Sequence, residues 1–169
     1  MSTPRICIVA VDKSQDSEFA LDWYIKNLYK TGDQVVLVYV PEGHGLLHAS
    51  KWENTVYSLN RDIMTGVSLD EQKQIVEVMS RFARKLRRLR IEGRVRNIMA
   101  LKPEDGILRA ADEENAEMIV VGCRGRGALH RTFGGSVSDY LVHHAPCPVV
   151  VCKRQHKSNF RFLLCTSAA

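Results

Sequence analysis

The sequence lacks any apolar run long enough to cross a membrane. Its longest runs, such as ICIVAV and PVVVC, are far shorter than the roughly 20 residues that a spanning helix needs. The opening residues, MSTPRICIVAV, contain neither a long apolar segment nor a small-residue cleavage site, so no secretory signal is expected. These features predict a cytoplasmic protein without a membrane partner.

The pattern of the cysteines argues against two kinds of site. There are five cysteines, an odd number, and no pair has the CxxC spacing. Together with the missing secretory signal, this predicts free thiols in a reducing compartment. A zinc site is not expected for the same reason.

Acidic residues are nearly absent between Arg81 and Arg96, where eight basic residues stand against Glu92 alone. The formal net charge of +5 therefore comes from one patch, and the rest of the chain is slightly acidic. A nucleic-acid interface would be expected to mix aromatic with basic residues or to carry a known motif, and neither is visible. The patch favours a solvent-exposed helix face, and no nucleic-acid partner is predicted.

Two common phosphate-binding motifs are missing. No GxxxxGK[ST] loop occurs, and GRGALH fails the dinucleotide fingerprint because His130 stands at its last position. No set of nucleophile, base and orienting residue is apparent either. These absences argue against a P-loop nucleotidase and against an efficient hydrolase.

Short apolar segments alternate with segments of helical pattern along most of the chain. The expected strands are 5–12, 34–40, 94–100, 117–122 and 147–153, and the expected helices are 17–28, 68–89, 103–115 and 136–145. Because most strands are apolar on consecutive residues, both faces of the sheet should be covered. The sequence predicts an α/β fold with a five-stranded parallel sheet, whose ligands bind beyond the carboxyl ends of the strands.

Three details of the helices can be predicted from capping and periodicity. Ser14 or Ser17 should cap the first helix, and a Ser68–Glu71 capping box should open the second. The apolar stripe of the second helix should consist of Ile75, Val78, Phe82, Leu86 and Leu89, with the arginines on the other side.

Five of the eleven glycines fall within fifteen residues, from Gly122 to Ser136, directly after the expected strand 117–122. A single glycine there would only indicate a turn. Five of them before a helix favour an anion site, because a helix N-terminus presents unpaired N–H groups that glycine leaves accessible. The expected ligand carries phosphate groups.

The spacing Gly122, Gly125, Gly135-Ser136 follows the pattern G-x2-G-x9-G-[S/T]. With VAVDKS, LVYV, ENAEMIVVGCRGRGAL and GSVSDYLVHHAPCPVVVCK, this resembles the ATP-binding branch of the universal stress protein family, from Arg5 to Lys153. The resemblance implies a Rossmann-like fold of the adenine-nucleotide α-hydrolase type, with strand order 3-2-1-4-5. It also implies a domain at 1–153 and a flexible tail at 154–169.

The resemblance also implies a ligand, ATP with Mg²⁺, and roles for individual residues. Asp12 would contact the ribose or adenine, or alternatively would serve only as a helix-capping carboxylate. The base pocket would be lined by Ala10, Val11 and Val40. The phosphates would be held by Gly122, Arg124, Gly125, Gly135, Ser136, Val137 and Ser138. Gly134 departs from the family pattern, in which a larger residue is common.

The function implied is that of a cytosolic, ATP-binding stress-response and signalling module. Two alternatives stay open: a slow ATPase or nucleotide-hydrolysing enzyme with the same pocket, and an interaction module without bound nucleotide. Residues 41–67 could close over the pocket as a lid. An apolar edge at the fifth strand needs covering, and the resemblance implies a homodimer through Val149–Val151.

Other candidate residues are weaker. His143 and His144 end a helix, where cations suit the helix dipole, so they do not indicate a metal site. His44 and His48 fall in the long segment after the second strand and are expected to be ordinary loop residues. Cys123 lies inside the glycine motif, where modification would block the pocket.

Overall fold

A computed structural model describes residues 4–41, 69–123 and 137–154. Its elements are β1 (Ile6–Val11), α1 (Gln15–Asn27), β2 (Gln34–Tyr39), α2 (Leu69–Leu89), β3 (Gly93–Asn97), α3 (Pro103–Glu113), β4 (Met118–Cys123), α4 (Val137–His144) and β5 (Val149–Lys153). The strands form one parallel sheet in the order β3-β2-β1-β4-β5. The predicted fold class and strand order are confirmed.

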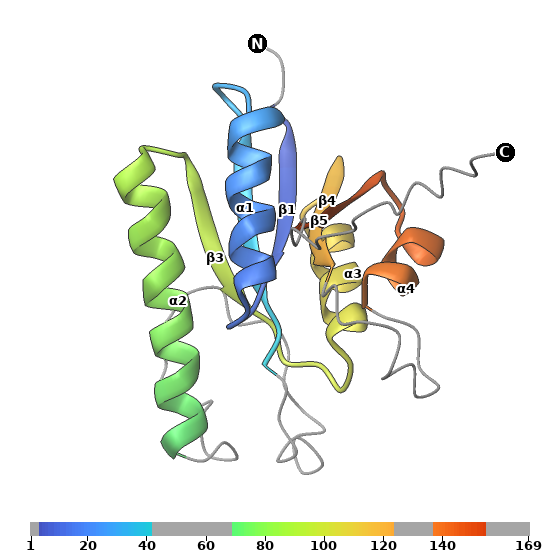
Figure 1. The fold of residues 1–169 in the computed structure, drawn as a ribbon. Coiled ribbons are helices and arrows are strands. Elements are labelled where there is room, and N and C mark those ends of the chain that lie inside the picture. The colour runs from blue at the N-terminus through green and yellow to red at the C-terminus, as the bar shows by residue number, and fades with distance from the viewer. Residues whose placement is uncertain (1–3, 42–68, 124–136, 155–169) are drawn as a thin grey trace, which may run out of the picture.

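Helices cover both faces of the sheet (Figure 1). On β1, Cys7 and Val9 lie in the core beneath α1 and α2. The alternate residues Ile8 and Ala10 lie in the core on the α3 and α4 side. Successive side chains of a strand thus point to opposite faces of the sheet and pack into two different cores. This is why the strands are apolar at nearly every position.

Helix α1 begins where capping predicts. Ser14 is its N-cap, in an extended conformation, and its hydroxyl accepts a hydrogen bond from the Ser17 N–H at 3.2 Å. Of the two serines considered for this role, Ser14 is the cap, and Ser17 is buried inside the first turn. Gly32 follows the helix with φ of +95°, a conformation that glycine adopts without steric cost.

The apolar stripe of α2 is confirmed for Ile75, Val78, Phe82 and Leu86, which are all buried. Leu89 is a wrong prediction, because it is 41% exposed. Leu86, in the same last turn, is only 3% exposed, so the period of the stripe alone could not show which of the last positions pack against the core. Ser68 and its capping box lie outside the described residues.

The basic patch is only partly the solvent-exposed helix face that was predicted. Arg81 and Lys85 turn towards α1 and pair with Glu18 and Asp22. On the edge strand β3, Arg96 is only 4% exposed. Its guanidinium binds carboxylates of α3, namely Glu113 at 2.6 Å and Glu114 at 2.7 Å, and Glu114 also pairs with Arg94. The exposed remainder comprises Arg84, Arg87, Arg88 and Arg90.

The prediction of free thiols is confirmed for Cys7, Cys123, Cys147 and Cys152. Cys7 and Cys152 are buried in the core beneath α1. Burial disfavours a thiolate, and it raises the pKa of the Cys152 thiol to about 11. Both core thiols are therefore expected to stay unreactive in the folded protein.

Candidate functional site

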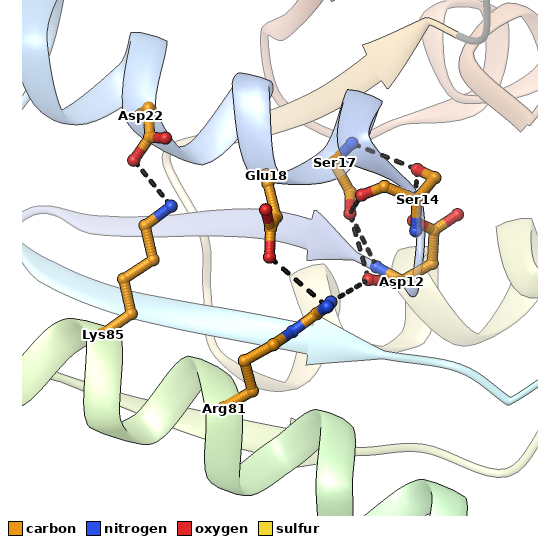
Figure 2. Close-up of polar contacts among 7 residues, drawn as sticks. All are labelled: Asp12, Ser14, Ser17, Glu18, Asp22, Arg81 and Lys85. Carbon is orange, nitrogen blue, oxygen red and sulfur yellow. Dashed lines mark hydrogen bonds and ion pairs between the residues drawn. The ribbon is translucent and has the colours of Figure 1, made fainter.

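Asp12 follows β1 and is held at three points by the start of α1 (Figure 2). Its Oδ1 atom accepts from the Ser14 N–H at 2.7 Å and from the Ser14 hydroxyl at 2.5 Å. The Asp12 N–H donates to Ser17 Oγ at 3.1 Å. The Asp12 carboxylate thus holds Ser14, which is itself the N-cap of α1, and this network fixes Asp12 at the carboxyl end of β1.

Gly122, the first glycine of the motif, lies against the backbone of α1. A Cβ at this position would be 2.5 Å from the Asp16 carbonyl oxygen and 3.1 Å from the Ser17 nitrogen. Real Cβ atoms do not approach backbone that closely, so no larger residue fits without a shift of the helix. This glycine thus has a packing reason of its own, and it brings β4 next to the residues that hold Asp12.

The expected base pocket residues do not all face the same way. Ala10 and Val40 share the core on the α3 and α4 side, and Val137 packs against that core. Val11 belongs to the opposite core, beneath α1 and α2. The side chains of Ala10 and Val40 can therefore line one surface, while Val11 could reach a ligand there only through its backbone.

Helix α3 also packs closely on Val40, through a glycine. A Cβ at Gly106 would be 2.8 Å from Val40 Cγ2 and 3.2 Å from the Ala100 Cβ. Val40 is only 6% exposed as a result.

Val137 and Ser138 open α4, and Ser138 is buried. The other expected phosphate-binding residues, Arg124, Gly125, Gly135 and Ser136, lie outside the described residues. The same is true of Gly134, His44, His48 and nearly all of the expected lid. The structure thus brings Asp12 and Gly122 together and gives the position of α4, while the middle of the motif stays a prediction.

Two side chains that the sequence did not single out also reach this edge of the sheet. Arg154, after β5, donates to Gln15 Oε1 at 2.8 Å and lies 3.5 Å from Asp16 Oδ1. Arg154 was assigned to the flexible tail, but its side chain is attached to α1. Arg81 of α2 donates to the Asp12 carbonyl at 3.1 Å. Neither contact could be predicted from spacing along the sequence, because the partners are 139 and 69 residues apart.

The histidines that end α4 have local partners. His144 Nδ1 lies 2.9 Å from the Tyr140 carbonyl oxygen, and the two rings stack with centroids 4.0 Å apart. Within residues 4–41, 69–123 and 137–154, no group of three or more His, Cys, Asp and Glu side chains could hold a metal ion. None of the described helices is long and apolar enough to cross a membrane.

Comparison with known proteins identifies the family of this chain. The model of the universal stress protein family (Usp) matches residues 4–153. The chain therefore belongs to the universal stress protein family.

Curated relatives include a plant protein and a bacterial protein. The chain is 31% identical over 157 residues to the universal stress protein PHOS34 of Arabidopsis thaliana, covering 86% of this chain and 60% of that protein. It is 30% identical over 158 residues to the universal stress protein MT2061 of Mycobacterium tuberculosis, covering 89% of this chain and 50% of that protein. The chain thus spans 50% to 60% of the length of these relatives.

Solved structures share the fold. One is a universal stress protein family protein of Arabidopsis thaliana with AMP bound, 20% identical with a TM-score of 0.61, covering 90% of this chain and 93% of that one. Another is the Archaeoglobus fulgidus universal stress protein in complex with dAMP, 24% identical with a TM-score of 0.60, covering 89% and 98%. A third is a universal stress protein in complex with cAMP, with a TM-score of 0.64.

Proposed function

We propose that this chain is an adenine-nucleotide-binding module of the universal stress protein family, with ATP and Mg²⁺ as its ligand. The observation that carries the proposal is the meeting of Asp12, Gly122 and the start of α1 at the carboxyl ends of β1 and β4. This is where parallel α/β sheets bind ligands. Relatives of the same fold bind AMP, dAMP and cAMP, which supports adenine recognition.

The proposal assigns the two parts of the nucleotide to two parts of the motif. Asp12 would bind the ribose or base, and Ala10, Val11 and Val40 would line the base pocket, Val11 through its backbone. Gly122, Arg124, Gly125, Gly135, Ser136, Val137 and Ser138 would hold the phosphates. Backbone N–H groups before a helix suit a phosphate, because each donor is unpaired and the helix dipole favours negative charge.

Isothermal titration with AMP, ATP and Mg·ATP tests the assignment, together with mass spectrometry of small molecules released from the denatured protein. Micromolar binding of ATP, strengthened by Mg²⁺, is the expected result. Steady ATP turnover well above the uncatalysed rate would instead favour a nucleotide-hydrolysing enzyme. A parent protein that binds neither AMP nor ATP would contradict the proposal and favour the interaction-module alternative.

Gly125→Asp should lower ATP affinity at least tenfold, about 1.4 kcal/mol. Its side chain would crowd the phosphates and add like charge. Ser136→Ala should lower affinity less, because only the hydroxyl is lost and the backbone N–H remains. Titration of both variants measures the difference, and urea unfolding should show little change in the stability of the nucleotide-free protein. Equal affinity in the parent and a folded Gly125→Asp variant would mean that the glycines only form a turn.

We also propose that β5 forms a homodimer interface. Among the described strands β5 pairs only with β4, and Val151 on it is 40% exposed. An unpaired apolar edge is an aggregation hazard unless it is covered. Val150→Pro and Val151→Lys should both weaken association in analytical ultracentrifugation.

Val76→Lys is a matched control for the homodimer, because Val76 is 46% exposed on α2, which packs beside β3 at the other edge of the sheet. It adds the same charge and should leave association unchanged. A parent that is monomeric at high micromolar concentration would contradict the proposal. So would a folded Val150→Pro variant that associates as well as the parent.

The domain boundary and the cellular role are part of the same proposal. Residues 1–153 would form the universal stress protein domain, since the family match covers residues 4–153. The segment 154–169 would follow it as a tail, attached at Arg154 to α1. The stress-response role and the cytosolic location expected from the sequence stay predictions.

A further inference from the structure

Arg81 connects helix α2 to the residue proposed to bind the ribose or adenine. Its Nη2 donates to the Asp12 carbonyl oxygen at 3.1 Å, and its Nη1 lies 3.4 Å from Glu18 Oε1 on α1 (Figure 2). One guanidinium thus joins α2, the first turns of α1 and the end of β1. The planar fork of arginine suits this arrangement, because its two terminal nitrogens can serve two acceptors at once.

Arg81 donates to the Asp12 carbonyl from its guanidinium, whereas the Ser17 hydroxyl that also approaches this carbonyl is shared. Ser17 Oγ lies 3.1 Å from the Asp12 carbonyl oxygen and 3.0 Å from the Ser14 carbonyl oxygen. A hydroxyl has one proton, so it can donate to only one of these carbonyls at a time. Arg81 supplies a donor to Asp12 whichever carbonyl the Ser17 hydroxyl serves.

The Arg81 guanidinium packs beside an aromatic ring, but the side chain is only partly buried. Its central carbon lies 4.9 Å from the centre of the Phe82 ring, and Phe82 is fully buried. The Arg81 and Glu18 side chains are 40% and 38% exposed. An ion pair as exposed as this contributes little to stability. The contact with Asp12 is therefore the feature of Arg81 that bears on the site.

We propose that Arg81 is a positioning residue for nucleotide binding, which holds the main chain of Asp12 so that its carboxylate faces the ribose or base. This inference rests on the proposed function. It differs from a direct phosphate contact, because Arg81 would act through Asp12 and not through its own charge. The part of the ligand concerned is common to AMP and ATP, so both should be affected alike.

Helix α2 offers a matched control one turn further along. Lys85 Nζ lies 2.7 Å from Asp22 Oδ1, and this pair also joins α2 to α1, at Asp22 (Figure 2). Arg81→Met and Lys85→Met each remove one positive charge and one bridge between the same helices. Only Arg81→Met removes the donor to the Asp12 carbonyl.

Titration of parent, Arg81→Met and Lys85→Met with AMP and with ATP tests the proposal. Arg81→Met should weaken both nucleotides by about tenfold, as expected for a misplaced polar contact. Lys85→Met should change affinity by less than about twofold, because its partner is Asp22 and not the Asp12 carbonyl. Hydrogen exchange of the nucleotide-free proteins should show faster exchange over residues 12–17 in Arg81→Met and parental exchange there in Lys85→Met.

The outcomes separate this inference from the proposed function. If the parent binds neither nucleotide, the proposed function fails and the inference fails with it. If the parent binds and Arg81→Met binds equally well, only the inference is overturned. A loss that is much larger for ATP than for AMP, or a loss without faster exchange over residues 12–17, would assign Arg81 a direct electrostatic effect and would overturn the positioning role.

Discussion

Gly122→Ala should destabilise the protein by about 2–3 kcal/mol, because it forces a methyl group into a closely packed backbone. The new Cβ would lie 2.5 Å from the Asp16 carbonyl oxygen and 2.8 Å from its carbonyl carbon. Neither atom can rotate away, so β4 and the first turn of α1 must separate. Urea unfolding of the nucleotide-free protein measures the change in the free energy of unfolding.

The same substitution should also weaken ATP binding. The displaced turn contains Ser17, whose Oγ lies within 3.1 Å of both the N–H and the carbonyl of Asp12. A shift of the turn therefore moves the residue that is proposed to bind the ribose or base. Gly122→Ala should lose stability and affinity together, whereas Gly125→Asp should lose affinity alone.

Gly32→Ala is the control for a glycine substitution without steric overlap. A Cβ at Gly32 would have no atom within 4 Å, and the only cost is the left-handed backbone at φ of +95°. That cost is about 1 kcal/mol, without an effect on nucleotide binding. If Gly122→Ala proves as stable as the parent, the packing explanation of this glycine is wrong.

Much of the fold could be predicted from the sequence because its signals are local. Apolar runs such as residues 34–40 and the N-cap at Ser14 each depend on neighbours along the chain. The strand order followed from the resemblance to a known family. Leu89 was misplaced because the period of a helical stripe does not show which positions near the helix end are packed.

The candidate site could be predicted only in part, since two of its features depend on contacts between distant segments. Gly122 was expected to make room for phosphate, and the structure adds a need for close approach to α1. Arg81 was counted among the exposed basic residues, and its contact with the Asp12 carbonyl depends on how α2 packs beside α1. Asp12 was expected either to bind ligand or to cap a helix, and in the structure the N-cap of α1 is Ser14, which the Asp12 carboxylate holds by two hydrogen bonds.

Asp33→Asn should cost about 3 kcal/mol of stability at neutral pH, as expected when one partner of a buried ion pair is removed. The Asp33 side chain is 5% exposed and pairs with Arg5 at the end of the sheet opposite the candidate site. Its oxygens accept from Arg5 Nε at 3.1 Å, from Arg5 Nη2, from the Lys30 N–H at 2.9 Å and from the Tyr24 hydroxyl at 3.3 Å. An asparagine has one acceptor oxygen, so its NH₂ group would face at least one of these donors.

Asp22→Asn is the matched control, because it removes the same charge from a pair whose carboxylate is 60% exposed. It should cost less than about 1 kcal/mol. Chemical denaturation of parent and both variants at pH 7 compares the two sites. Equal losses at Asp33 and Asp22 would mean that the buried network contributes no more than a surface pair.

The pH dependence gives a second, independent test of the Asp33 network. Burial by itself would raise the pKa of the Asp33 carboxyl, but the hydrogen bonds from Arg5 and Lys30 and the charge of Arg5 together lower it below its ordinary value. A carboxyl with a lowered pKa in the folded state stabilises the protein above its unfolded pKa of about 3.9 and loses this effect as the pH falls towards the folded value. The difference in unfolding free energy between parent and Asp33→Asn should therefore be constant from pH 7 to about pH 5 and should shrink below about pH 4. Since all other carboxyls are common to both proteins, a difference that stays constant down to pH 3 would show that the pKa of Asp33 is not lowered by folding.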